Sequence, residues 1–144
     1  MSLRVVLDTN VLVSGLLATR GYPRQLIDLW LAGKFSLITS LYQIDELHRV
    51  LSYPRIVHRI RLTDNELAIF FSTLSEKSEI VATTPDLSGI TRDPKDDAIV
   101  ACAVAGRAEY VISGDNDLLV LDEYESIRFV SPTEFVTQFA ADEL

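Results

Sequence analysis

The chain has 144 residues, 48% of them hydrophobic and 24% charged, which is ordinary for a single folded domain. A formal net charge of −8 argues against a protein that coats nucleic acid through a broad basic face, but it leaves room for a smaller basic patch beside acids that bind cations. The longest apolar run, 98–105, is too short to cross a bilayer, and Asp8 comes too early for a secretory signal. We therefore expect one cytoplasmic domain over 1–144, with no membrane segment.

Short apolar segments alternate with segments of helical periodicity along the first half of the chain. In chain order these predict a strand over 3–7, two helices within 11–31, a strand over 35–39, a helix over 40–51, a short helix over 55–60, a helix over 63–76 and a weak strand over 79–82. Capping boxes open two of the helices, at Ser40 with Gln43 and at Thr63 with Glu66.

The second half of the chain begins with a loop over 83–92, which has no hydrophobic period. Asp93 is expected to cap the next helix, with Pro94 as its first residue, and this helix continues through the apolar run 98–105. The remaining elements are a strand over 110–113, a strand over 128–130 and a final helix that begins after Ser131. This alternation predicts parallel strands joined by helical crossovers, in a three-layer α/β/α sandwich.

Acidic residues follow two of the buried strands, where an open parallel sheet binds its ligands. Asp8 comes directly after the first strand, and Asp115 and Asp117 come after the fourth. Carboxylates that converge repel one another unless a cation joins them, and oxygen ligands without His or Cys favour Mg²⁺ or Mn²⁺. Two further acidic clusters lie at Asp45 with Glu46 and at Asp93, Asp96 and Asp97. The sequence therefore predicts a hard-metal site with the chemistry of phosphodiester hydrolysis.

Each of these acids also has a simpler explanation. Asp8 alone would serve equally well as a helix N-cap, and some acids of the 93–97 cluster only complement the helix dipole. Asp45 and Glu46 point about 100° apart on one helix, so spacing does not choose between them. The segment between Glu46 and Asp64 is basic, and it is either a solvated helix face or a phosphate-binding surface. Its arginines are Arg49, Arg55, Arg59 and Arg61.

Taken together, the acidic segments resemble the PIN-domain family, the fold of the VapC-like ribonuclease toxins of toxin–antitoxin pairs. The matching segments are 5–12 (VVLDTNVL), 46–47 (EL), 97–101 (DAIVA) and 113–118 (SGDNDL), which span most of the chain. Each is short, but their order and spacing are specific. The segment 92–97 (RDPKDD) further resembles a subgroup described as PIN-family toxin components.

The resemblance implies a central five-stranded parallel sheet in which strands one and four are neighbours. It selects Glu46 over Asp45, and Asp97 over Asp93 and Asp96. The implied catalytic and metal-binding acids are Asp8, Glu46, Asp97 and Asp115, with Asp117 as a fifth metal ligand and with Thr9, Asn10 and Ser113 as hydrogen-bonding neighbours. The implied function is a Mg²⁺- or Mn²⁺-dependent endoribonuclease that acts as a toxin, with a cognate antitoxin as partner and a homodimer as its assembly.

Two other functions are compatible with parts of the pattern. A haloacid-dehalogenase-type phosphatase also has an aspartate after its first strand and a later glycine–aspartate pair, as in Gly114-Asp115. That family needs a second aspartate two residues after the first, and the chain has Asn10 there. A noncatalytic PIN-fold module that binds RNA or protein is the second alternative, although such modules normally lose their acidic residues.

Overall fold

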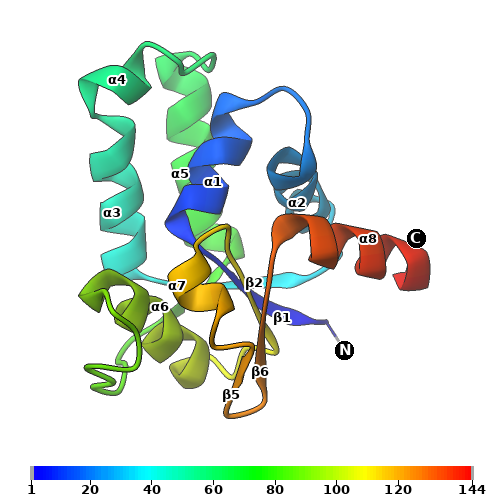
Figure 1. Cartoon of the computed structure of the whole chain (residues 1–144). Coiled ribbons are helices and arrows are strands. Elements are labelled where there is room, and N and C mark those ends of the chain that lie inside the picture. Colours follow the sequence, from blue (N-terminus) through cyan, green and yellow to red (C-terminus); the bar gives the residue numbers. More distant parts are fainter. Residues whose placement is uncertain (1, 144) are drawn as a thin grey trace.

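A six-stranded sheet forms the centre of the protein (Figure 1). The computed structural model describes residues 2–143, and the side-chain surroundings of residues 2–139. The strands lie in the order β3-β2-β1-β4-β6-β5. Their bounds are β1 (Arg4–Leu7), β2 (Ser36–Ser40), β3 (Glu79–Val81), β4 (Tyr110–Ile112), β5 (Glu123–Tyr124) and β6 (Ile127–Val130).

The five strands expected from the sequence are all present, and their pairings are all parallel. The sixth strand, β5, is a two-residue edge strand antiparallel to β6. The two strands are joined by Glu125 and Ser126, both with positive φ, at 47° and 69°. Two-residue hairpin loops of this type usually have Asn or Gly at these positions, and neither residue is present here. The sequence therefore carried no signal for β5.

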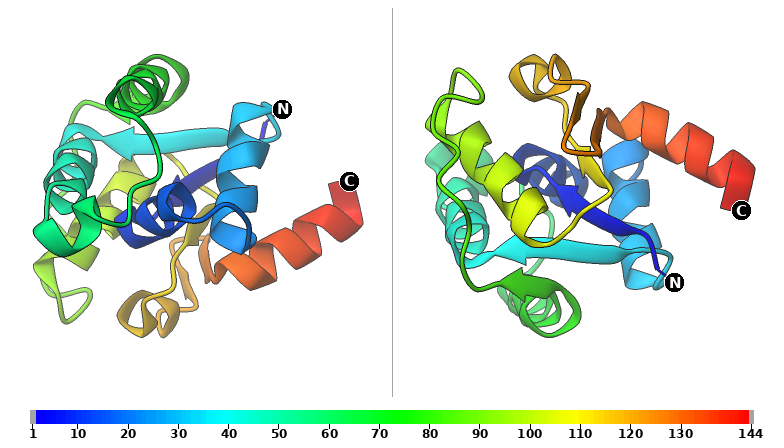
Figure 2. Two further views of the ribbon diagram at one scale, coloured as in Figure 1. Left: turned by 90° about the horizontal axis from the view of Figure 1, so that it is seen from above. Right: turned by 90° about the horizontal axis from the view of Figure 1, so that it is seen from below.

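Helices cover both faces of the sheet, which gives the three layers of an α/β/α sandwich (Figure 2). One face packs against α1, α2, α3, α5 and α8, and the other packs against α6 and α7. The helices are α1 (Thr9–Leu17), α2 (Tyr22–Leu31), α3 (Leu41–Leu51), α4 (Pro54–Val57), α5 (Asp64–Lys77), α6 (Pro94–Ala105), α7 (Asn116–Leu119) and α8 (Pro132–Glu143). Within the described residues, no helix has the length and apolar character needed to span a membrane.

The two-residue period of a strand explains how β1 joins two cores. Val5 and Leu7 belong to the core under α1, whereas Val6 between them packs into the core under α6. All three side chains are fully buried, as expected for the central part of a parallel sheet. β1 is therefore held from both sides, and it positions Asp8, the residue that follows it, rigidly.

Side-chain caps fix the start of several helices. Thr63 and Glu66 form the complete capping box at α5, and Ser131 and Glu134 form a second one at α8. Asp93 caps α6 as expected, because its carboxylate accepts a hydrogen bond of 2.9 Å from the Lys95 amide. These contacts set where α6 begins, and α6 carries acidic residues into the site.

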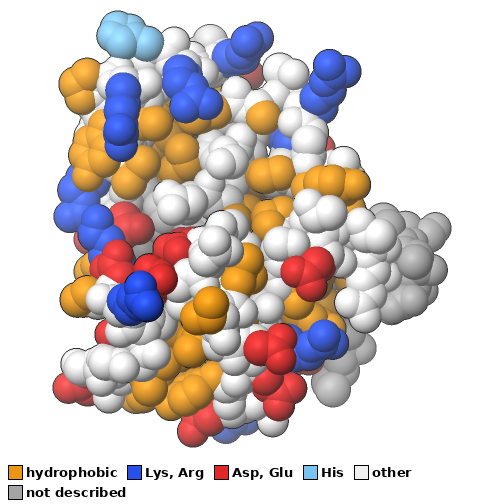
Figure 3. Space-filling view, in the orientation of Figure 1, with side chains coloured by type: hydrophobic (Ala, Val, Ile, Leu, Met, Phe, Trp, Pro, Cys, Tyr) orange, Lys and Arg blue, Asp and Glu red, His pale blue; other side chains and the backbone are white. Residues whose placement is uncertain are grey.

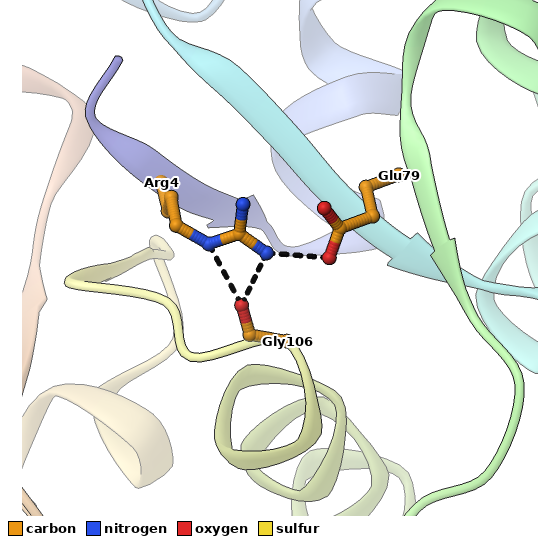
Figure 4. A network of polar contacts seen from close by, with 3 residues as sticks. All are labelled: Arg4, Glu79 and Gly106. Atoms are coloured by element: carbon orange, nitrogen blue, oxygen red, sulfur yellow. Dashed lines mark hydrogen bonds and ion pairs between the residues drawn. The ribbon is translucent and has the colours of Figure 1, made fainter. Parts of the chain in front are cut away.

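Arg4 is the one charged residue within β1, and it links three elements at the amino end of the sheet (Figure 4). Its guanidinium donates to the Gly106 carbonyl at the end of α6, with Nε and Nη2 at 2.9 and 2.6 Å. Nη2 also forms an ion pair with Glu79 on β3. Arg4 thus ties β3 and the end of α6 to the central strand, at the end of the sheet opposite Asp8.

Candidate functional site

The carboxyl ends of β1 and β4 lie side by side at the point where the strand order reverses. From this point the chain order runs through β2 and β3 on one side and through β6 and β5 on the other. The Asp8 amide donates to the Ile112 carbonyl at 3.0 Å, which continues the β1–β4 ladder by one residue. Ligands of open α/β sheets bind in the crevice at such a point. The arrangement brings Asp8 close to the loop that contains Ser113 and Asp115.

Asp8 is buried, and its carboxylate makes no capping bond to α1. Instead, it accepts a hydrogen bond of 2.7 Å from the Ser113 hydroxyl, whose oxygen accepts one of 2.9 Å from the Asp115 amide. Burial raises the pKa of Asp8, the Ser113 hydrogen bond opposes this effect, and the negative charges of Asp115 and Glu46 add to it. The Asp8 carboxylate therefore bonds to Ser113 and does not cap α1.

Asp96 is the acid of α6 that faces this point. It is only 6% exposed, and one oxygen each from Asp96, Asp115 and Asp117 lie within 4.8 Å of one another. Burial, followed by the negative charges of Asp115, Asp8 and Asp93, raises the pKa of Asp96 to about 7. A carboxyl group so close to other acids is costly to ionise unless a cation is bound.

Asp97 was expected to be the ligand from α6, and the structure does not bring it into this cluster. Its Oδ1 accepts hydrogen bonds from the Thr91 amide and hydroxyl, at 2.6 and 2.9 Å, and its Oδ2 accepts one of 3.0 Å from the Gly89 amide. Burial is the largest single influence and raises the pKa of Asp97, but the hydrogen bonds from Thr91 and Gly89 together outweigh it, so the pKa is lowered. The physical reason is helical geometry, because neighbours on a helix point about 100° apart. Asp97 holds the preceding loop, and Asp96 faces the acids.

Glu46 reaches the same cleft from α3, whereas Asp45 beside it is exposed. The start of α3 is fixed by Gln43, whose side-chain amide donates to the Leu7 carbonyl and accepts a 3.2 Å hydrogen bond from the Thr39 hydroxyl. Only half of the expected capping box at Ser40 is therefore present, namely the bond from the Gln43 amide to the Ser40 hydroxyl. Gln43 instead joins the helix that carries Glu46 to the residue before Asp8.

These side chains line a cleft of about 320 Å³. Its acids are Asp8, Glu46, Asp93, Asp96 and Asp115, and the other lining residues are Asn10, Val13, Val50, Tyr53, Arg55, Ile56, Lys95 and Ile99. Figure 3 shows acidic side chains gathered in a hollow between the regions of α3 and α6, with basic side chains beside them. Of the expected supporting residues, Asn10 lines the cleft, Ser113 bonds Asp8, and Thr9 is buried with its hydroxyl unpaired.

The donor set fits a divalent cation of the Mg²⁺ or Mn²⁺ class. Among the described residues, three buried side-chain oxygens have no hydrogen-bond partner, and two of them are carboxylate oxygens of this cleft, Glu46 Oε2 and Asp96 Oδ2. A buried carboxylate oxygen without a donor is unfavourable, and a bound cation removes that cost. All the candidate ligands are oxygens, as these cations prefer.

The four arginines of the basic segment, which are the candidate phosphate contacts, differ in whether they line the acidic cleft. All four are exposed, and Arg55 alone among them lines the cleft. Figure 3 shows basic and hydrophobic side chains on the surface over α3 and α4, above the acidic hollow. Arg55 is therefore placed to contact a group bound at the acids, whereas Arg49, Arg59 and Arg61 lie outside the cleft.

A larger hollow of about 770 Å³ lies at the other end of the strands. Its lining includes Leu3, Arg4, Tyr110 and Phe135, and Glu109 is the one acid among its described lining residues. It offers no set of converging carboxylates. Of the two hollows, the smaller cleft at the carboxyl ends of β1 and β4 is therefore the one lined by several acids.

Comparison with known proteins agrees with this fold. The family model described as PIN domain matches residues 4–117. An uncharacterized protein of Methanocaldococcus jannaschii is 26% identical over 147 residues, which cover 96% of this chain and 93% of that protein. The crystal structure of VapBC2 from Rickettsia felis, bound to a DNA fragment from their promoter, contains a chain with a similar fold. The TM-score is 0.58 at 17% identity, over 90% of this chain and 98% of the other.

Proposed function

Because the chain belongs to the PIN-domain family, we propose that it is a divalent-metal-dependent endoribonuclease that hydrolyses RNA phosphodiester bonds. PIN domains are generally nucleases, which leaves the haloacid-dehalogenase alternative without support. The observation that carries the proposal is the gathering of unpaired, buried carboxylate oxygens in one cleft that also contains Arg55 and Lys95. The proposed metal ligands are Asp8, Glu46, Asp96, Asp115 and Asp117, with Asp96 in place of Asp97.

A bound Mg²⁺ or Mn²⁺ would lower the pKa of a water molecule and stabilise the charge on the attacking and leaving oxygens. The residues around it hold the ligands in place. Ser113 keeps one oxygen of Asp8 engaged and fixes the Asp115 amide, so the ligands from β1 and β4 keep a constant separation. Gln43 does the same for Glu46 by joining α3 to the end of β1. Such supporting bonds commonly change metal affinity by about 10- to 100-fold.

RNA would approach through the basic surface over α3 and α4. Arg55 is the candidate phosphate contact at the cleft, and Arg49, Arg59 and Arg61 are candidate contacts farther along the strand. The net charge of −8 makes this local surface necessary, because the rest of the molecule repels a polyanion.

We further propose that the protein is the toxin of a toxin–antitoxin pair that acts in the cytoplasm. The support is the family and the fold shared with a chain of the VapBC2 structure. The proposal implies a cognate antitoxin as protein partner, and a homodimer as the expected assembly. Co-expression with the product of an adjacent small gene, followed by size-exclusion chromatography, tests both.

The direct test of the nuclease proposal uses purified protein and single-stranded RNA. Cleavage should require Mg²⁺ or Mn²⁺, stop with a chelator, and disappear in Asp8→Asn and Asp96→Asn. The matched variant Asp97→Asn should retain metal-dependent cleavage, because Asp97 lies outside the acidic cluster. Undiminished cleavage by Asp8→Asn and Asp96→Asn would overturn the assignment.

The noncatalytic module is distinguished by a separate measurement. Metal that binds the native state must raise the melting temperature. A melting temperature that does not respond to Mg²⁺ or Mn²⁺, together with RNA binding without cleavage, would replace the nuclease by a binding module.

A further inference from the structure

One wall of the acidic cleft is formed by an aromatic ring and aliphatic side chains. Tyr53, Val50 and Ile56 line it from the end of α3 and the start of α4, and Val13 and Ile99 add to the apolar surface. A metal ion and a phosphate need only charged and polar groups, so this apolar surface suggests that the ligand also has an apolar part. The cleft therefore offers both carboxylates and apolar groups to one ligand.

Tyr53 is fixed at this wall by the backbone. Pro54 follows it and restricts its backbone to the extended region, where Tyr53 is found with φ −63° and ψ 135°. The Tyr53 carbonyl accepts hydrogen bonds of 2.9 Å from the amides of both Ile56 and Val57, and its own amide donates to Val50 at 3.2 Å. Tyr53 is 37% exposed as a residue and lines the cleft, so part of it is open to solvent. An exposed tyrosine on a rigid backbone makes a stacking surface without a large loss of conformational freedom.

Two cations lie in the same cleft without carboxylate partners. Arg55 and Lys95 both line it beside five acids, yet among the described residues the ion pairs are Arg4 with Glu79 and Arg24 with Asp28. Arg55 and Lys95 are therefore available for an anionic ligand. Arg55 comes from α4, next to the aromatic wall, and Lys95 comes from α6, next to the acids.

We propose that Tyr53 forms a nucleobase subsite, in which an unpaired base next to the scissile bond stacks on the Tyr53 ring while Arg55 and Lys95 contact the flanking phosphates. The inference rests on the proposed nuclease function and specifies its substrate as single-stranded RNA. A base within a duplex is stacked on both faces and paired at its edge, whereas an unpaired base swings out and stacks on an aromatic side chain. The volume of about 320 Å³ lies at the low end for ligand pockets, which suits one nucleotide.

The test measures coupling between Tyr53 and one base. Binding of a labelled single-stranded RNA is followed by fluorescence anisotropy in the Asp96→Asn background, which prevents cleavage. Tyr53→Leu should weaken RNA binding about tenfold, whereas Tyr53→Trp should leave the affinity unchanged. An oligonucleotide with one abasic residue should bind about tenfold more weakly than the intact oligonucleotide to the protein that retains Tyr53. With Tyr53→Leu already present, the same abasic residue should cost less than twofold. Tyr22→Leu is the matched control, because Tyr22 is 40% exposed but lies on α2 outside the cleft.

The possible outcomes distinguish a failure of the Tyr53 subsite from a failure of the nuclease proposal. Metal-dependent cleavage together with equal abasic penalties in Tyr53 and Tyr53→Leu would overturn the subsite and leave the nuclease intact. Efficient cleavage of a fully paired RNA would also overturn it. Failure of the protein to bind or cleave any RNA would overturn both proposals.

Discussion

Replacing Asp96 by Asn should make the metal-free protein more stable at pH 8. The pKa of Asp96 is raised from 3.8 to about 7 by burial and by the neighbouring acids. A shift of about three units corresponds to at most about 4 kcal/mol for ionising the folded protein. Because the cleft is open to water, which screens part of this cost, we expect about 1–2 kcal/mol. Asn has a similar shape and carries no charge, so the variant avoids this cost.

The sign of the pH dependence follows from the raised pKa. The folded protein binds the Asp96 proton more tightly than the unfolded chain does, so this group destabilises the fold progressively as the pH rises from about 4 to about 7. Above that range the cost is complete, and below it the cost vanishes. The advantage of Asp96→Asn should therefore be largest at pH 8 and nearly absent at pH 4.

The assay is thermal unfolding of both proteins with a chelator and with Mg²⁺ or Mn²⁺. Without metal at pH 8, Asp96→Asn should melt roughly 3–8 °C above the wild type. With metal the order should reverse, because a metal at 100 times its Kd adds about 2.7 kcal/mol to the wild type and the variant loses most of this gain. A variant that is less stable than the wild type without metal, or that keeps the full metal-induced rise, would refute the reasoning.

Asp97→Asn is the control with the opposite expectation. It removes part of the hydrogen bonding that Asp97 provides to Thr91 and Gly89, so it should lower the stability of the metal-free protein by about 1 kcal/mol. The rise in melting temperature on adding metal should remain. If Asp97→Asn and not Asp96→Asn abolishes that rise, Asp97 is the ligand, as the family resemblance implied.

Three other predictions follow from single contacts. Ser113→Ala should weaken Mn²⁺ binding about tenfold by calorimetry, because it frees Asp8 and the Asp115 amide, and an unchanged affinity would remove Ser113 from the support of the site. Gly15→Ala should lower the free energy of unfolding by about 1–3 kcal/mol in urea, because a Cβ there would lie 2.5 Å from Ile27 Cδ1, and equal stability would show that this side chain moves without cost. Arg55→Met should make the plot of log binding constant against log salt concentration for single-stranded RNA shallower by about 0.7, the amount expected for one lost phosphate contact. An unchanged slope would exclude a phosphate contact by Arg55.

The strands and their parallel pairing follow from the sequence because the signal is strong and local. Val5, Val6 and Leu7 form an apolar run that only a strand covered on both faces accommodates. The short edge strand β5 gives no such signal, since Glu123 and Tyr124 have neither hydrophobic alternation nor a characteristic turn after them. Its formation depends on tertiary pairing with β6.

For the candidate site, the sequence indicates the acids that follow strands more clearly than the acids that lie on helices. Asp8 and Asp115 follow strands, and the sheet topology alone brings them together. The choice between Asp96 and Asp97 depends on helix rotation, which is decided by where Thr91 and the α6 cap lie. Gln43 was assigned to a capping box by its spacing, and its bond to Leu7 depends on a contact 36 residues away that no local pattern contains.

The bond between Ser113 and Asp8 joins residues 105 positions apart. Contacts of such separation form late, because a long loop must be closed before they gain anything. While the chain is being synthesised, its first strand and α3 emerge well before β4, so Asp8 and Glu46 exist for some time without Asp115. The acidic site is therefore incomplete until β4 and the residues after it, 113–117, have also emerged from the ribosome and folded.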